Sequence, residues 1–447
     1  VFIIFAKIII LAVLAIFVDK ITERLKYTFN FVFNNLIITD YQLYDNLDDF
    51  KNCEDCKFVY SKQHYDQPSF IYAKSILFKR DIITVTVPTG EIDSVPVIFT
   101  HTNADSMLMF DPFAAIFYMI SRYEEYLPYE KDVHGRYLHT NSIAHRCNFL
   151  KVPIVHIWGE MLQNALSQRF PQLTFKHGSY NFLPTIDVDN AYLHINKGVV
   201  RVAGGVIKSL VKLDYNTFIE KILTILRIKK DPYDVFDELI EIQKNKKFKF
   251  RFFFLLADYG GYDKSSGVND ISFIRLIKHV RDYCQVGIHP SYASFDDKLL
   301  LREEIDTLKE IIHCPIKISR QHFLRLDIKY TFNYLYDNGI TEDYSLGYAE
   351  TTGFRAGTCI PYNYFDLKNN ETSKLKIYPL SVMDATLVNY MKLDSTASIE
   401  EISRIINIIK KYNGTCIPLW HNSSLSNRNE WINKSYIFNE MLKMAEN

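Results

Sequence analysis

The chain has 447 residues, and its 52 basic and 52 acidic residues cancel to a formal net charge of zero. This length is too great for one ordinary domain, so we expect two. The balanced charge gives no overall field that would favour nucleic acid. Seven cysteines without a framework spacing argue against a disulfide scaffold and favour a reducing compartment. The aromatic content of 15 % suits a large core, with sugar-stacking surfaces as a second use.

Residues 1–18 are almost all apolar, interrupted by Lys7 and followed by Lys20, Arg24 and Lys26. This segment is near the lower length limit for a membrane-spanning helix. A membrane anchor and a buried N-terminal strand-helix unit are both compatible with it, as is an extended start without structural meaning. We therefore treat residues 1–19 as a separate segment, and the localisation stays open between cytoplasmic and membrane-associated.

Residues 20–180 mix strand-like runs at 83–87 and 95–100 with helix-like runs at 111–121 and 155–167. Their histidines are scattered and show no spacing typical of metal ligands. The sequence predicts a smaller accessory α/β domain without a metal ligand.

From residue 181 to 447, strand-like and helix-like runs alternate. Strands are predicted at 249–257, 286–288, 316–319, 375–382 and 415–419, and helices at 268–283, 300–312, 328–338, from Ser398 with a capping box to Glu401, and at 431–445. Such alternation implies a parallel sheet. Roughly seven units over about 260 residues are typical of a closed or nearly closed barrel.

Polar residues follow five of the apolar runs. The cassettes are Thr-Ile-Asp-Val-Asp (185–189), Gly-Ile-His-Pro (287–290), Ser-Arg-Gln-His (319–322), Gly-Phe-Arg-Ala-Gly (353–357) and Leu-Trp-His (419–421). Barrels carry their chemistry at the carboxyl ends of the strands, so these cassettes should form one site. A carboxylate left unpaired in a dry environment costs several kcal/mol, and metal ligation or general base catalysis commonly retains such a pair.

These motifs, in this order, resemble the polysaccharide deacetylase family, the carbohydrate esterase family 4 or NodB-homology barrels. The resemblance covers residues 182 to about 424 and implies a distorted (β/α)7 barrel with a divalent metal ion, usually zinc. The preceding region is similar to an uncharacterised domain that accompanies such barrels in some bacterial proteins.

The resemblance also implies roles for individual residues. Asp187 matches the general base and Asp189 a metal ligand, while His289 matches the first histidine ligand. Arg355 would orient Asp187 through a charge-assisted hydrogen bond. His421 would be the general acid, with Asp384 as the carboxylate near it.

One position departs from the family pattern. The usual second histidine ligand lies four residues after the first, and Ala293 occupies that position here. Neighbouring barrel strands place their carboxyl ends side by side, so we infer that His322, after the next strand, shares the metal with His289. Asp258, after the strand at 249–257, is a further candidate for the site.

The leading interpretation is a metal-dependent hydrolase that removes an acyl group, specifically N-acetyl, from a carbohydrate. Tyr292, Tyr362 and Trp420 flank the motifs and are candidates for stacking on sugar faces, although core packing is the commoner role for such residues. A catalytically inactive barrel that binds polysaccharide and a C–N hydrolase acting on a non-sugar amide remain as alternatives.

Overall fold

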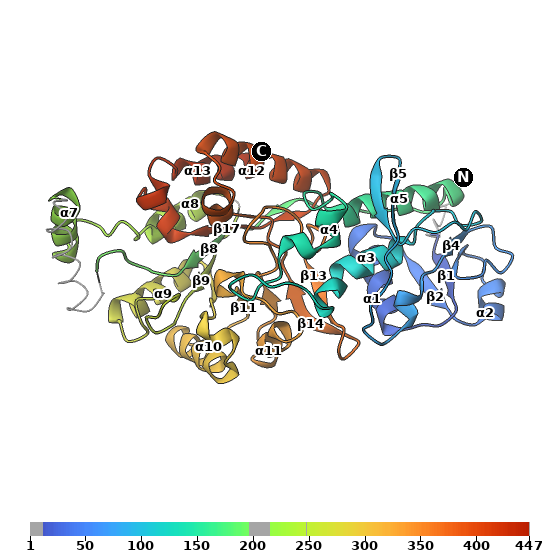
Figure 1. Cartoon of the computed structure of the whole chain (residues 1–447), viewed down its shortest axis with the longest axis horizontal. Coiled ribbons are helices and arrows are strands. Elements are labelled where there is room, and N and C mark those ends of the chain that lie inside the picture. The colour runs from blue at the N-terminus through green and yellow to red at the C-terminus, as the bar shows by residue number, and fades with distance from the viewer. Residues whose placement is uncertain (1–11, 196–214, 247, 447) are drawn as a thin grey trace, which may run out of the picture. The chain divides into compact units, whose positions relative to one another are not determined.

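The computed structural model describes residues 12–195, 215–246 and 248–446 (Figure 1). The chain divides into two compact units. The first comprises Val1–Tyr129, Thr140–Ser179 and Ala356–Ser373, and the second comprises Glu130–His139, Tyr180–Arg355 and Lys374–Asn447. The expected contiguous division near residue 180 therefore differs from this one, because each unit contains a segment from the other half of the sequence.

The first unit is built on a four-stranded parallel sheet in the order β2-β1-β3-β4. Its strands are β1 (Leu14–Val18), β2 (Tyr41–Tyr44), β3 (Cys56–Ser61) and β4 (Phe70–Tyr72). Strand β1 is central and fully buried, which supports the buried-strand interpretation for these five residues. Residues 1–11 lie outside the described part of the chain. None of the described helices is long and apolar enough to cross a membrane.

Two helices of the first unit, α3 and α5, match the runs predicted at 111–121 and 155–167, whereas one predicted strand is absent. The helices of this unit are α1 (Glu23–Phe31), α2 (Leu47–Asn52), α3 (Pro112–Ile120), α4 (Ile143–Arg146) and α5 (Ile154–Arg169). The strand predicted at 83–87 is wrong, since the Tyr123 hydroxyl bonds both the N–H and the carbonyl of Ile83 in place of a strand partner. The hairpin of β5 (Thr89–Ile92) and β6 (Val95–Ile98) follows it. Strand β13 (Tyr362–Asp366) also belongs to this unit.

The second unit holds a parallel sheet in which β14-β12-β11-β10-β9-β8-β17-β15 lie side by side. Its strands are β8 (Thr185–Val188), β9 (Arg251–Phe254), β10 (Gln285–Ile288), β11 (Ile318–Ser319), β12 (Glu342–Asp343), β14 (Glu371–Ile377), β15 (Val382–Met383) and β17 (Pro418–His421). Strands β7 (Asn181–Phe182) and β16 (Thr415–Cys416) pair separately. The α/β class with parallel strands is confirmed.

Closure of this sheet into the expected barrel is not seen. Among the described residues no ladder joins β15 to β14, and the sheet is open in its hydrogen bonding. The strand predicted at 375–382 is in fact β14 and β15 with a break between them, and the run at 415–419 is likewise divided between β16 and β17.

Helices α8 to α12 lie between strands along the chain, and α13 follows the last strand (Figure 1). The helices of the second unit are α7 (Tyr215–Ile225), α8 (Phe236–Asn245), α9 (Ile271–Tyr283), α10 (Lys298–Ile312), α11 (Thr331–Asp337), α12 (Ser395–Lys411) and α13 (Tyr436–Glu446). The capping box predicted at Ser398 is wrong, because α12 begins earlier, where the Asp394 carboxylate accepts from the Ala397 N–H at 2.9 Å. Aspartate is among the strongest helix N-caps.

The centre of the second sheet is packed against aromatic and aliphatic side chains on both faces. Phe252, Phe253 and Phe254 of β9 are all fully buried, as expected for a strand of a covered parallel sheet. Phe253 packs in one cluster with Ile318 and Tyr344. The parallel order β11-β10-β9-β8 places the carboxyl ends of these strands along one edge of the sheet.

We predict that Gly287→Ala destabilises the second unit. A Cβ at Gly287 would lie 2.4 Å from Ile318 Cγ1 and 2.6 Å from the Ile318 carbonyl oxygen, which cannot move independently of β11. Overpacking of this kind lowers the free energy of unfolding by about 2 kcal/mol or more. Urea unfolding measures the loss. In Gly261→Ala, where a Cβ meets nothing within 4 Å, the midpoint should stay unchanged.

Candidate metal centre

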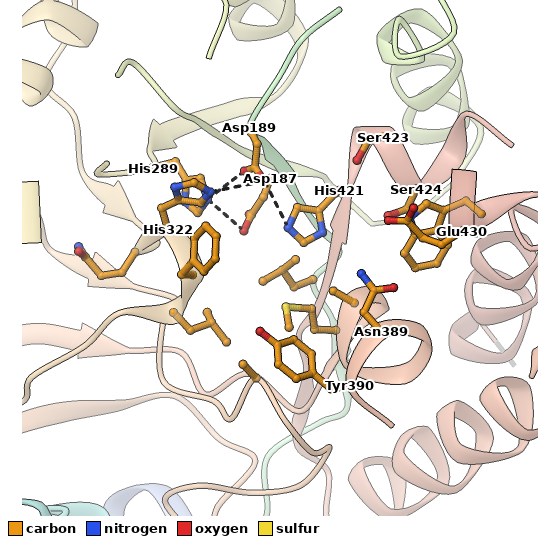
Figure 2. Close-up of a pocket in the computed structure, with 18 of the residues that line it drawn as sticks. Asp187, Asp189, His289, His322, Asn389, Tyr390, His421, Ser423, Ser424 and Glu430 are labelled. Atoms are coloured by element: carbon orange, nitrogen blue, oxygen red, sulfur yellow. Dashed lines mark ion pairs between the residues drawn. The ribbon is translucent and has the colours of Figure 1, made fainter. Parts of the chain in front are cut away.

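A cavity of about 290 Å³ opens at the carboxyl ends of the strands in the second unit (Figure 2). Asp187 and Asp189 reach it from the end of β8, His289 from the end of β10, His322 from the end of β11 and His421 from the end of β17. Five polar side chains from four separate strands thus face one space, and all of them belong to cassettes singled out in the sequence.

Three of these side chains converge closely enough to hold one cation. The ligand atoms of Asp189, His289 and His322 all lie within 4.8 Å of one another. Asp189 Oδ1 lies 3.3 Å from His289 Nε2, and Asp189 Oδ2 lies 3.6 Å from His322 Nε2. Asp189 Oδ1 and His289 Nε2 are both buried and have no hydrogen-bond partner among the described residues. A buried oxygen and a buried nitrogen without hydrogen-bond partners fit a bound divalent ion. One carboxylate and two imidazoles are a donor set that suits zinc.

Hydrogen bonds to the far nitrogens orient both imidazoles. His289 Nδ1 lies 2.5 Å from the Arg320 carbonyl oxygen, and since a carbonyl can only accept, Nδ1 carries the proton. The lone pair of His289 is therefore on Nε2, which faces Asp189. His322 Nδ1 lies 2.8 Å from Asp263 Oδ1, a carboxylate–histidine pair of the kind that supports metal ligands.

The charges in the cluster favour the ionised carboxylate. Burial alone would raise the pKa of Asp189, but His322, His421 and His289 overcome it and hold that pKa well below its ordinary value. Burial lowers the pKa of His322, and Asp189 and Asp263 more than compensate, so that its pKa rises to about 9.

Asp187 lies beside the cluster, and its arginine partner is not the expected one. The side chain is almost fully buried, with Oδ2 3.7 Å from His289 Nε2 and Oδ1 accepting from Arg320 Nη1 at 3.0 Å. Arg355 instead donates from Nη1 to the Gly347 carbonyl and lies outside the cavity lining. The expectation that Arg355 orients Asp187 is thus corrected to Arg320, which stands two residues before His322 in the same cassette.

His421 and Asp384 form the expected pair. Asp384 is fully buried, and its Oδ1 lies 2.8 Å from His421 Nδ1 while its Oδ2 accepts from the His421 backbone N–H at 2.8 Å. The Ala385 N–H and the Ser424 hydroxyl also donate to this carboxylate. Burial lowers the pKa of His421, but Asp384 and Asp189 raise it to about 10. His421 Nε2 lies 3.8 Å from Asp189 Oδ2, so the ring faces the cluster.

None of the three predicted sugar-stacking residues lines the cavity. Trp420 is buried against Phe438, and Tyr362 is a buried residue of the first unit. Tyr292 lies behind Phe323, outside the lining. Tyr362 and Trp420 point into packed interiors because each stands within a buried strand, whereas Tyr292 is half-buried. The aromatic residues that line the cavity are Phe323, Tyr390 and Trp431.

In the loop after β9, the acidic residue that belongs to the site is Asp263 and not the candidate Asp258. Asp258 is exposed and does not line the cavity. Asp263, five residues later, holds His322 and also accepts from the Tyr292 N–H at 2.9 Å. Nothing in the linear pattern marks Asp263, since it follows the loop Tyr-Gly-Gly-Tyr rather than a strand.

Comparison with known proteins gives one family model and several solved structures. Residues 14–171 match a family of unknown function, DUF7033, in agreement with the expected uncharacterised N-terminal domain. None of the curated proteins matches the chain. A candidate polysaccharide deacetylase from Mycobacterium smegmatis is similar at 14 % identity, with a TM-score of 0.39 and coverage of 60 % of this chain and 83 % of that one.

Two further solved structures are similar at comparable levels. A polysaccharide deacetylase from Bacillus cereus has 12 % identity and a TM-score of 0.29, with 59 % of this chain and 87 % of that one covered. A CE4 family pseudoenzyme from Bacillus anthracis has 9 % identity and a TM-score of 0.26, with 60 % and 62 % covered.

We predict that the purified protein binds one zinc ion per chain through Asp189, His289 and His322. His322→Ala removes a ligand, and Asp263→Asn should weaken the affinity about 10–100-fold because the supporting carboxylate is lost. Titration calorimetry with elemental analysis measures both. His139→Ala is the matched control, since His139 pairs with Glu350 at 2.7 Å and does not line the cavity. Full zinc content in His322→Ala would remove His322 from the ligand set.

We also predict that zinc affinity depends on pH through His322. Its pKa of about 9 without metal means that this imidazole is protonated at neutral pH, whereas a ligand imidazole must be neutral. Binding then releases one proton, and affinity should fall about tenfold for each unit by which the pH is lowered below about 9. Zinc titrations at several pH values test this. If zinc affinity still falls about tenfold per pH unit in His322→Ala, the released proton comes from another group.

Proposed function

We propose that the second unit is a metal-dependent hydrolase that removes an N-acetyl group from a carbohydrate. The observation that carries the proposal is the placement of two proton-transfer groups around one ligand cluster. Asp187, held by Arg320, and His421, held by Asp384, both lie within 4 Å of the Asp189–His289–His322 cluster. Amide hydrolysis needs a base for the attacking water and an acid for the departing nitrogen.

The two groups are held by different partners. Arg320 donates to Asp187 Oδ1 at 3.0 Å, and Asp187 Oδ2 lies 3.7 Å from His289 Nε2. Asp384 and Asp189 stabilise the charged imidazole of His421, whose pKa of about 10 keeps it protonated at neutral pH. A carboxylate held by an arginine and a protonated imidazole in one cavity are the arrangement expected of a base and an acid.

The reaction follows from these states. A divalent ion, when bound, lowers the pKa of water and polarises an acyl carbonyl. Asp187 accepts the proton of the attacking water, whose oxygen bonds to the acyl carbon. His421 donates its Nε2 proton to the amide nitrogen as the C–N bond breaks, and Asp384 holds the ring in place. The products are a free amine on the sugar and acetate.

Two other functions remain to be compared with this one. An inactive polysaccharide-binding domain would have no need for the buried Asp187–Arg320 and His421–Asp384 pairs, because burying charge without use is costly. A hydrolase of non-sugar amides would share the same proton-transfer groups. The cavity combines aromatic Tyr390 and Trp431 with polar Asn389 and Glu430, and this mixture suits a sugar ring with its hydroxyl groups.

We predict that Asp187→Asn and His421→Ala each lower kcat about 10²–10⁴-fold on an N-acetylated glycan while zinc content is retained. The His421 variant should also change the alkaline limb of the pH–rate profile. Acetate release measures the rate, and Asp258→Asn, an exposed carboxylate outside the cavity, serves as the matched control. Full activity in either variant would show that its assigned role is wrong.

A further inference from the structure

A second cavity, of about 250 Å³, lies within the first unit and shares no lining residue with the candidate metal centre. Arg24 of α1 and the short helical turn Ser75–Phe78 contribute to its lining. Residues 83–86 form another wall instead of joining a sheet. Two hydrogen bonds of 3.0 Å between the Tyr123 hydroxyl and the backbone of Ile83 hold this wall in place. A wall held in this way is preorganised for a ligand.

Arg24 places a buried positive charge at this cavity without a bound carboxylate. The side chain is fully buried. Its guanidinium donates to four uncharged acceptors, which are the Asn370 side-chain oxygen and the backbone carbonyls of Ile76, Arg80 and Asp81. No ion pair in the described part of the chain includes Arg24, and the exposed Asp81 carboxylate lies beyond ion-pair distance. Burial lowers the pKa of Arg24, and the opposing influence of Tyr123 and Asp81 does not restore it.

The other polar groups of the cavity are donors that also lack partners. They are the hydroxyls of Ser75, Thr84 and Thr86 and the ammonium of Lys79. None of these side chains takes part in a hydrogen bond or an ion pair with another described residue. No acidic side chain is among the lining residues that the structure describes, and the apolar part of the lining is Ile76, Ile83 and Val85. A buried charge normally has a counter-ion, so this cavity suits an anion.

We propose that this cavity binds a small organic phosphate monoester. A phosphate monoester carries a charge of about −1.5 to −2 at neutral pH and three acceptor oxygens. This charge matches the two cations Arg24 and Lys79, and the oxygens match the three hydroxyl donors. A carboxylate brings one charge and would leave one cation without a counter-ion. The carbon skeleton of the ester would pack on the aliphatic wall, as in most small-molecule sites. The proposal concerns the first unit and does not depend on the hydrolysis proposed for the second.

The test measures the affinity of phenyl phosphate for the full chain by titration calorimetry, in the presence of EDTA so that no metal ion binds the probe. Phenyl sulfate has the same shape and a single negative charge, and it serves as the comparison ligand. We expect phenyl phosphate to bind at least about tenfold more tightly than phenyl sulfate, because the second charge is compensated as well. Inorganic phosphate should bind more weakly than phenyl phosphate, since it makes no contact with the aliphatic wall.

A variant of Lys79 locates the binding. Lys79 is exposed in the free protein, so Lys79→Gln should fold normally, and it should weaken phenyl phosphate binding about tenfold or more. Lys79→Arg should keep the affinity. Lys62→Gln is the matched control, because Lys62 is exposed on the same unit and does not line the cavity. Absence of phenyl phosphate binding, equal affinities for the phosphate and the sulfate, an unchanged affinity in Lys79→Gln or an equal loss in Lys62→Gln would each overturn the proposal.

Discussion

The buried guanidinium of Arg320 connects Asp187, the proposed base, to the candidate metal ligands. Its Nη1 donates to Asp187 and to the Thr185 hydroxyl on β8, and its Nε donates to the Tyr344 carbonyl beyond β12. Its own carbonyl orients His289. The guanidinium is fully buried, with Nε and Nη1 occupied and a carboxylate near, whereas Nη2 has no hydrogen-bond partner among the described residues. The placement of Asp187 and His289 therefore depends on Arg320, at the carboxyl end of β11.

Around this residue the centre balances buried charge of both signs. The carboxylates of Asp187, Asp189, Asp263 and Asp384 face the side chains of Arg320, His322 and His421. His322 Nδ1 is bonded to the Asp263 carboxylate and His421 Nδ1 to the Asp384 carboxylate. His289 Nδ1 is bonded to the Arg320 carbonyl. The carboxylate partners raise the pKa of their imidazoles, which suits a proton donor at His421 and makes metal binding at His322 compete with a proton.

Residues 130–139 contribute to the second unit although they precede its first strand by some distance in the chain. Arg136, tied to Asp132 by a 2.6 Å ion pair, restrains the carbonyl of Phe323, and His134 packs on Phe323 and Tyr262. The candidate metal ligands come from residues 189–322, but the wall beside them depends on this earlier segment. A protein that begins near residue 180 would lose these restraints while keeping all three ligands.

The sequence by itself determined the α/β class, the alternation of strands and helices, and the placement of Asp187, Asp189, His289, His322 and His421 at one end of the sheet. These follow from local patterns, because a polar residue directly after a buried parallel strand has only one edge on which to lie. The pairing of His421 with Asp384 was also anticipated from motif order.

Only the tertiary structure decided which arginine holds Asp187, which carboxylate holds His322 and which aromatic residues face the cavity. Arg320 and Arg355 both follow apolar runs, and their roles depend on the distance between strands that are not neighbours in sequence. Asp263 reaches His322 from an irregular loop, and Tyr362 and Trp420 are buried in their strands. Such choices depend on side-chain direction and packing across the fold, which a linear pattern does not contain.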